Sequence, residues 1–323
     1  MRLLVTGANG FLGSQIVRQA IEAGMAVRAT DKGMAPLVPV EHYCRADILD
    51  SSSLTPALNE VDVVIHAAGL AHVFDKPQAG TAPFRAVNEI GTANVAQAAA
   101  FSGVKHFVLV SSVSVYGPFT RGAYDETVPC HPEGPYAQSK YQAERRAIEI
   151  AETSGMRLTI LRLATLYGEG DPGNVARLMR TIDRGRFIWV GDGSNRKSLL
   201  YRGDAARACL TVTHGPSEGI RTYNVSAPPC TMREVVEGLA HALGRHLPHW
   251  RVPAPLVLRL AQVAAQFTWG RGRLGSLHAT TQKWLADDVY DAGKFHRTFD
   301  FQTQVALAEG LCREAAWYRD RTR

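Results

Sequence analysis

The sequence is poor in cysteine, and its cysteines lie too far apart for a zinc ribbon or a redox pair. The chain has five: Cys44, Cys130, Cys209, Cys230 and Cys312. An odd number of scattered cysteines argues against a secreted disulfide scaffold and favours a reducing compartment such as the cytoplasm. The eleven histidines show no metal-ligand spacing, so no metal site is predicted.

Long apolar runs are also lacking. The most lipid-like stretch, Leu256 to Phe267, is shorter than the ~20 residues of a membrane span, and Arg259, Gln262 and Gln266 interrupt it. We interpret it as an amphipathic helix packed on the protein, so membrane contact is not expected. Because the segment Met1–Gly7 leads directly into a predicted strand, no signal peptide is expected either.

Neither sign of charge dominates the sequence. There are 36 basic and 30 acidic side chains among 323 residues, a net charge of +6, and the basic residues are spread along the chain. Nucleic-acid binders usually concentrate basic residues in a stripe or tail, so no nucleic-acid partner is predicted. A composition of 46% hydrophobic and 20% charged residues excludes wholesale disorder.

The first half of the sequence alternates short β-branched runs with longer Ala-rich stretches. Strands are predicted at Leu3–Thr6, Ala26–Thr30, Val61–His66, Phe107–Val110 and Leu158–Leu161. Helices are predicted at Phe11–Ala23, Phe84–Ser102 and Tyr136–Ser154. Apolar strands alternating with helices are typical of a parallel sheet covered on both faces. The predicted fold class is therefore α/β, with a doubly wound parallel sheet.

A glycine-rich turn joins the first predicted strand to the first predicted helix. It reads TGANGFLG from Thr6 to Gly13, with the spacing G-x-x-G-x-x-G. Such glycines let backbone N–H groups approach a pyrophosphate, and the helix N-terminus adds a favourable partial charge. We therefore expect a Rossmann-type dinucleotide site. Its candidate contacts are Gly7, Asn9, Gly10, Phe11, Leu12 and Gly13.

Asp31 ends the second predicted strand, near the ~20-residue offset of the acidic residue that binds the ribose hydroxyls of a dinucleotide. Its carboxylate would accept both hydroxyls of NAD and repel the extra phosphate of NADP. Arg28 and Lys32 lie close in sequence and could soften this preference. NAD is the favoured cofactor, and NADP stays open.

The alternating pattern ends after about Tyr167, where a glycine-rich loop and later prolines interrupt the chain. We predict a dinucleotide-binding domain over residues 1–166, with a return segment at about 199–226. A smaller C-terminal substrate lobe would comprise residues 167–198 and 227–323.

Tyr136 and Lys140 lie four residues apart on a predicted helix, so they share one face of it. A free phenol has a pKa of ~10, which a nearby ammonium and a positive nicotinamide ring would lower. Ser111 and Ser112 end the preceding strand and could donate a hydrogen bond to a substrate oxygen. These residues together predict a tyrosine base beside a hydroxyl group that can bind a substrate oxygen.

With these motifs, the sequence resembles the extended short-chain dehydrogenases/reductases of the NAD-dependent epimerase/dehydratase family over nearly the whole chain. The resemblance implies that Ser112 orients the substrate, Tyr136 exchanges the proton and Lys140 holds the cofactor ribose while depressing the tyrosine pKa. It also implies further cofactor contacts, which are Asp47, Ile48, Ala67, Ala68 and Asn88.

Departures from the family pattern narrow the reaction. The family's 4,6-dehydratases have an Asp-Glu pair just after the catalytic hydroxyl, where this chain has Val113 and Ser114. Decarboxylating relatives have Glu at the second position. Both reactions are therefore disfavoured, which leaves hydride transfer once, as in a dehydrogenase or reductase, or twice, as in an epimerase.

The resemblance also extends to the substrate side. Asn174 matches the position where relatives bind a nucleotide diphosphate, and Lys197 stands where relatives have a diphosphate-clamping arginine, with Arg196 beside it. Lysine lacks the bidentate fork of arginine, which leaves this contact open. The predicted substrate contacts are Ser112, Ser114, Thr165, Asn174, Arg196 and Lys197.

The favoured hypothesis is an NAD-dependent nucleotide-sugar epimerase that acts on a UDP-sugar at C4 through a 4-keto intermediate. The alternative is a 3β-hydroxysteroid-dehydrogenase-like or other single-transfer oxidoreductase. A non-catalytic NAD-binding sensor is a third reading, against which the complete Ser112, Tyr136 and Lys140 set argues. Two Ala-rich helices, near Phe84–Ser102 and Tyr136–Ser154, resemble a dimer interface of the family, so a homodimer is predicted.

Overall fold

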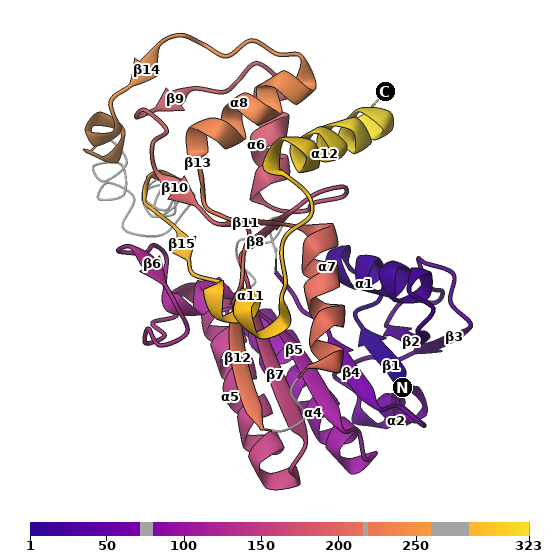
Figure 1. Cartoon of the computed structure of the whole chain (residues 1–323). Coiled ribbons are helices and arrows are strands. Elements are labelled where there is room, and N and C mark those ends of the chain that lie inside the picture. Colours follow the sequence, from indigo (N-terminus) through magenta and orange to yellow (C-terminus); the bar gives the residue numbers. More distant parts are fainter. Residues whose placement is uncertain (72–79, 216–218, 260–283, 323) are drawn as a thin grey trace.

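The structure is a computed structural model of the chain, and it describes residues 1–71, 80–215, 219–259 and 284–322. A seven-stranded parallel sheet lies at its centre, with helices on both faces (Figure 1). The strand order is β12 (Ile220–Val225), β7 (Arg157–Leu163), β5 (His106–Ser112), β4 (Val63–His66), β1 (Arg2–Thr6), β2 (Ala26–Asp31) and β3 (His42–Arg45). The predicted doubly wound α/β fold is confirmed.

The sheet is buried on both faces because successive side chains of each strand point to opposite sides. In β1, Leu3 and Val5 enter one core cluster and Leu4 enters the other. The first cluster packs under α1 (Phe11–Glu22) and α7 (Arg202–Thr211). The second packs under α2 (Ser51–Leu58), α4 (Gly91–Phe101) and α5 (Gly134–Ser154).

The strand order reverses between β1 and β4. From β1 the chain runs outward through β2 and β3, and it then returns to build β4, β5, β7 and β12 on the other side. In open α/β sheets, the crevice beyond the carboxyl ends of the strands at such a switch point binds ligands. The glycine turn after β1 and the serines at the end of β5 both lie at this edge of the sheet.

The helix predicted over Phe84–Ser102 is divided in the structure. A short helix, α3 (Ala82–Phe84), leads into a π-helical stretch over Arg85–Ile90, and α4 follows. π-helical turns are rare and often mark functional positions. Here the wide turn contains Asn88, a residue of the predicted cofactor site.

The C-terminal lobe lies above the sheet domain in Figure 1. Its core forms between α6 (Asn174–Asp183), α8 (Met232–Leu243) and α12 (Leu307–Thr322). Four small strand pairs connect it: β8 (Thr165–Tyr167) with β11 (Leu199–Tyr201), β9 (Trp189–Val190) with β14 (Arg251–Val252), β10 (Arg196–Lys197) with β13 (Cys230–Thr231), and β6 (Ala123–Tyr124) with β15 (Val289–Tyr290).

One C-terminal helix packs on the sheet domain instead of within the lobe. Helix α11 (Gly293–Phe299) returns to the sheet domain, where Phe295 packs edge-on against Tyr223 of β12. Residues 254–259 are helical, and the remainder of the predicted Leu256–Phe267 helix lies outside the described residues. Within the described ranges, no helix is long and apolar enough to span a membrane.

Candidate active site

The turn after β1 is packed so closely that it requires glycine. Gly7 has a φ of +67°, and a Cβ atom there would lie 2.6 Å from the Ala68 backbone. A Cβ atom on Gly13 would lie only 2.0 Å from the Gly7 carbonyl oxygen. Helix α1 follows with Gly10 as its N-cap, a residue that has no side chain to cap the first turn. This turn provides the close backbone approach and the helix N-terminus that a pyrophosphate needs.

Asp31 lies at the end of β2, directly beside the glycine turn. Its carboxylate accepts hydrogen bonds from the backbone N–H groups of Asn9, at 3.1 Å, and Gly33, at 3.2 Å. The Asn9 side chain is itself held by Ala35 and Leu37. Asp31 is therefore fixed where a carboxylate could bind ribose hydroxyls, which fits NAD.

The other predicted cofactor residues follow β3 and β4. Ala67 and Ala68 follow β4, where both backbone N–H groups donate to Thr6. Ile48 fills the space beside Gly91 of α4, where a Cβ atom would lie 2.5 Å from it. Asp47 caps its own loop by accepting a hydrogen bond from the Leu49 N–H group.

Asn88 joins three parts of the site from the π-helical turn. Its side-chain amide donates to the Leu70 carbonyl and to Ser139 Oγ, both at 2.9 Å, and its Oδ1 accepts from the Leu70 N–H group at 2.7 Å. Because Ser139 precedes Lys140 on α5, Asn88 links the loop after β4 to the helix that carries the predicted catalytic pair.

Ser112, Tyr136 and Lys140 meet at the carboxyl end of the sheet. Tyr136 and Lys140 lie one turn apart on α5, and Ser112 ends β5 and is hydrogen-bonded to Tyr136. The Lys140 ammonium donates to the Val110 carbonyl oxygen at 2.6 Å. All three residues line a cavity of about 420 Å³ that also reaches the glycine turn at Gly10–Gly13.

Burial shifts the pKa values of both Tyr136 and Lys140. Burial raises the pKa of Tyr136, and the hydrogen bond from Ser112 opposes this rise. Burial also lowers the pKa of Lys140 to about 8, against the favourable charge of Glu144. Desolvation is the dominant influence on Tyr136, and the Lys140 ammonium is bonded to the Val110 carbonyl oxygen. The expected lowering of the tyrosine pKa by Lys140 together with a nicotinamide ring stays a prediction.

Three predicted substrate residues line the same cavity. They are Ser114, Thr165 and Asn174. The Ser114 hydroxyl is buried and has no hydrogen-bond partner among the described residues, so it is available to a substrate. Asn174 begins α6, after a loop in which Asp171 accepts hydrogen bonds from the Gly173 and Ala176 N–H groups.

The two predicted diphosphate cations are separated. Lys197 lines a small adjoining cavity of about 60 Å³ together with Thr165 and Asn174, and its ammonium donates to the Ala286 carbonyl at 2.8 Å. Arg196 is exposed and lines neither cavity. The structure thus brings Lys197, but not Arg196, close to the substrate side.

Sequence reasoning missed Asp288 and Tyr290, which also line the main cavity. The Tyr290 hydroxyl donates to Asp288 Oδ1 at 2.6 Å, and its ring stacks on Tyr116 at 5.7 Å. They reach the site because β15 pairs with β6, more than 160 residues earlier in the chain. No short motif surrounds these residues, so only the tertiary pairing reveals them.

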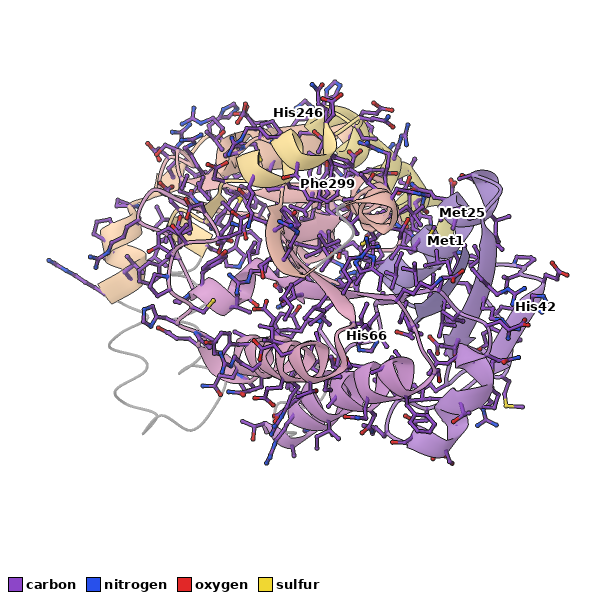
Figure 2. All side chains as sticks on the ribbon, turned by 60° about the horizontal axis from the view of Figure 1, so that its bottom comes forward. Met1, Met25, His42, His66, His246 and Phe299 are labelled. Atoms are coloured by element: carbon purple, nitrogen blue, oxygen red, sulfur yellow. The ribbon has the colours of Figure 1, made fainter. Side chains whose placement is uncertain are left out.

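His66, by contrast, is a structural residue within the sheet domain, whereas His42 and His246 lie near the surface (Figure 2). The His66 ring forms hydrogen bonds with the Thr6 hydroxyl at 2.7 Å and the Thr92 hydroxyl at 3.0 Å, and burial lowers the His66 pKa to about 3. In the part of the chain that the structure describes, no group of three or more His, Cys, Asp or Glu side chains is arranged to hold a metal ion.

Comparisons with known proteins identify the family of the chain. A family model described as "NAD dependent epimerase/dehydratase family" matches residues 3–226. The chain is 31% identical to the N-acetyl-alpha-D-glucosaminyl-diphospho-ditrans,octacis-undecaprenol 4-epimerase of Escherichia coli O157:H7, over 96% of this chain and 93% of the relative. It is 32% identical to the UDP-glucose 4-epimerase of Vibrio cholerae, over 79% of each chain.

A solved structure also resembles this one over its full length. MoeE5 in complex with UDP-glucuronic acid and NAD superposes with a TM-score of 0.79 at 26% identity, covering 99% of this chain and 100% of that chain. The similarity therefore includes the C-terminal lobe as well as the sheet domain.

Proposed function

The chain belongs to the NAD-dependent epimerase/dehydratase family, and we propose that it is a 4-epimerase of a nucleotide sugar, with a UDP-sugar as its substrate. One observation carries this proposal. A single cavity joins the glycine turn at Gly10–Gly13 to Ser112, Tyr136 and Lys140, and then to Asn174 in the lobe. That arrangement suits a dinucleotide on the sheet side and a second, diphosphate-bearing molecule on the lobe side, with the reacting alcohol between them.

The residues around the cavity supply the proton chemistry. Tyr136 Oη would take the proton of the C4 hydroxyl, while Ser112 donates a hydrogen bond to the same oxygen and fixes its orientation. Lys140, held by the Val110 carbonyl, would bring positive charge to the developing phenolate. NAD, when bound, supplies the hydride acceptor and then the hydride donor for C4.

Inversion requires the 4-keto intermediate to present its other face before the hydride returns. A cavity of about 420 Å³ leaves the sugar room to turn while the nucleotide end stays with Asn174. Dehydration of the substrate is disfavoured, because the residue after Ser112 is the buried, apolar Val113, and Ser114 has only a hydroxyl group.

A second candidate substrate is a sugar attached to a polyprenyl diphosphate. Its reaction at C4 would be the same. The observation that favours it is exposed apolar surface on the lobe, where Ile188, Trp250 and Leu256 are 47%, 57% and 50% exposed. Trp250 and Ile188 flank the paired strands β14 and β9, and Arg251 next to them is exposed. A lipid tail would find both apolar and cationic surface there.

The test is product analysis by NMR with purified enzyme and its bound cofactor. Interconversion of a UDP-hexose, UDP-hexosamine or UDP-uronate pair without net NADH formation supports the first proposal. Activity on a polyprenyl-diphosphate sugar alone would favour the second. Net NADH formation with a hydrophobic alcohol would replace both with the single-transfer oxidoreductase, and bound NAD without any turnover would favour the sensor.

We also propose that the protein is a homodimer through α4 and α5, which lie side by side on one face of the sheet (Figure 1). Phe101 at the end of α4 is 92% exposed, which a partner subunit would explain. Light scattering at micromolar concentration should give the mass of two chains, and a monomeric mass would contradict the proposal.

A further inference from the structure

Helix α5 carries a buried carboxylate, Glu144, one turn beyond Lys140. Glu144 follows Lys140 by four positions and Tyr136 by eight, so all three share a face of the helix. The Glu144 side chain is only 2% exposed. A carboxylate buried this deeply is costly unless it is paired and hydrogen-bonded.

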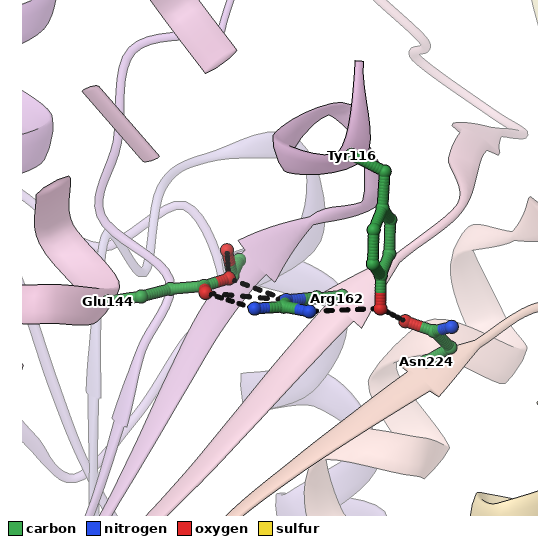
Figure 3. Close-up of polar contacts among 5 residues, drawn as sticks. Tyr116, Glu144, Arg162 and Asn224 are labelled. Carbon is green, nitrogen blue, oxygen red and sulfur yellow. Dashed lines mark hydrogen bonds and ion pairs between the residues drawn. The ribbon is translucent and has the colours of Figure 1, made fainter. Parts of the chain in front are cut away.

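The partners of Glu144 come from the strands that end at the active site (Figure 3). Ser111, the neighbour of Ser112, donates to Glu144 Oε1 at 2.5 Å. Arg162 of β7 donates to Oε2 through Nη2 at 2.7 Å and to Oε1 through Nε at 3.1 Å. The carboxylate therefore ties α5 to the ends of β5 and β7.

The same network continues away from the helix. Arg162 Nη1 donates to the Tyr116 hydroxyl, and this hydroxyl donates to Asn224 Oδ1 of β12, each at 2.9 Å. These bonds lie on the side of Arg162 that faces away from Glu144 (Figure 3). The network thus has a near end at Ser111 and α5, and a far end at Tyr116 and β12.

We propose that Glu144 is a positioning residue for the reaction, which fixes helix α5 against the end of β5 and keeps a negative charge beside Lys140. Through the Ser111 bond it would set how Tyr136 faces Ser112. Through its charge it would keep Lys140 protonated in a buried site. The inference rests on the role proposed above for Lys140.

The charges around Lys140 support the proposal that Glu144 keeps Lys140 protonated. Burial lowers the Lys140 pKa to about 8, and the Glu144 charge opposes that lowering. The other titratable groups near the pair are His66 of β4, which is neutral at ordinary pH, and Arg162, Tyr116 and Cys130 around the carboxylate. Glu89, on the π-helical stretch that packs on α5, is paired instead with Arg85 and Arg146.

Removal of the Glu144 charge should lower the Lys140 pKa and so shift the pH dependence of kcat. Lys140 loses its proton as the pH rises through about 8. Without the Glu144 charge its pKa falls further, so the basic limb of the kcat profile moves to lower pH. Glu144→Gln alone would leave Arg162 buried and unpaired. The double variant Glu144→Gln/Arg162→Met removes both charges together and is the variant to measure.

We expect the double variant to retain NAD and to show its basic limb ~1 pH unit or more below that of the wild type, which is about a tenfold loss of kcat above pH 8. The limb is read relative to each protein's own plateau, because loss of the Glu144 and Arg162 contacts lowers the plateau itself. Glu144→Asp, which keeps the charge, should leave the limb in place even if kcat falls. An unshifted limb in the double variant would overturn the electrostatic role.

Two hydroxyl deletions test the positioning role in variants that keep the ion pair. Ser111→Ala removes a hydrogen bond at the near end of the network, and Tyr116→Phe removes bonds at the far end. We expect Ser111→Ala to lower kcat about tenfold with KM unchanged, a loss typical of one hydrogen bond to a charged group. Tyr116→Phe should change kcat less than about threefold. Equal losses in the two variants would overturn the positioning role.

A direct titration separates this inference from the proposed function. The side-chain signal of Lys140 in ¹³C,¹⁵N-lysine-labelled protein, assigned through Lys140→Ala, reports its pKa without any substrate. A lower value in the double variant would support the role of Glu144 even if no nucleotide sugar were turned over. An unchanged value would reject that role even in an active epimerase.

Discussion

The sheet domain and the C-terminal lobe are built on different principles. In the sheet domain, five of the seven strands and the glycine turn come from residues 2–112, and two continuous cores cover both faces of the sheet. The lobe instead gathers one core from α6, α8 and α12, which are separated in sequence, and joins them by pairs of two- or three-residue strands.

This difference determines which residues cofactor binding and substrate binding depend on. The cofactor side depends on backbone geometry at Gly7 and Gly13, where any added atom collides with the chain. The proposed substrate side depends on side chains such as Ser114 in a 3₁₀ turn, Asn174 at the start of α6 and Asp288 beside β15. We therefore expect changes in the sheet domain to abolish chemistry or cofactor binding, and changes in the lobe to alter substrate affinity.

The largest effect should come from Tyr136→Phe. Removing the phenolic oxygen removes the base, and such groups contribute ~10²–10⁴-fold to rate. Folding and bound NAD should be nearly unchanged, which absorbance of the purified protein and thermal unfolding would show. Tyr141→Phe, five residues further along α5 and on another face of the helix, is the matched control and should keep full activity. Near-wild-type turnover by Tyr136→Phe would show that another group carries the proton.

Variants of Lys140 and Ser112 should differ from Tyr136→Phe in kcat and in bound-NAD content. Lys140→Ala should lower both kcat and the bound-NAD content, because it removes the cation proposed to hold the cofactor ribose. Ser112→Ala should be the mildest of the three, since it removes one orienting hydrogen bond and leaves the base in place. Identical profiles for all three variants would contradict these separate roles.

The next largest effect is expected from Gly13→Ala in the turn between β1 and α1. Its Cβ atom would lie 2.0 Å from the Gly7 carbonyl oxygen, so the turn must open and the purified protein should lose its bound NAD. The matched change in the lobe is Gly238→Ala in α8, where the nearest atom is a Leu311 methyl group at 2.8 Å in the lobe core. That variant should retain NAD. Full NAD content in Gly13→Ala would refute the assignment of this turn.

Asn174→Ala should affect the lobe side alone. Losing one hydrogen bond to a charged ligand group costs ~1.5–3 kcal/mol, so we expect KM to rise by about tenfold or more. The kcat value and the NAD content should stay close to wild type. A fall in kcat with unchanged KM would place Asn174 in the chemistry instead of in substrate binding.

The smallest effects, those of pH on stability, should have opposite signs in the two regions. In the sheet domain, burial lowers the pKa of His66 and His106 to about 3. The unfolded chain binds protons at these histidines below pH ~6.5, so stability should fall as the pH drops from there toward 3. In the lobe, burial and the Asp171 charge raise the pKa of Glu314 to about 8. Its ionisation in the unfolded chain should cost stability as the pH rises from ~4.5 to 8.

Two substitutions check these signs by thermal unfolding across pH. Glu314→Gln keeps an oxygen that can accept the Gly168 N–H bond and removes the titration, so it should stabilise the protein at pH 8 more than at pH 5. His106→Gln should flatten the acid side of the profile in the same way. Parallel profiles for wild type and both variants would count against these two assignments.

The sequence predicted the sheet domain better than the lobe, for a physical reason. Strands such as Val63–His66 are buried on both faces and so are mostly apolar, and Gly7 and Gly13 have no room for a Cβ atom, so both leave a local pattern. Asp288 and Tyr290 reach the cavity only through the pairing of β15 with β6, which leaves no local pattern. Glu144 is similar, because its helical position alone does not reveal that its partners are Ser111 and Arg162.

The central claim is that hydride leaves C4 of the sugar and returns to the same carbon from within the protein. The most direct measurement uses UDP-glucose carrying deuterium at C4, with products analysed by NMR and mass spectrometry. The account predicts that the 4-epimer forms with its deuterium retained and with no net NADH. Loss of the deuterium to solvent, or retention of configuration with net NADH formation, would contradict it.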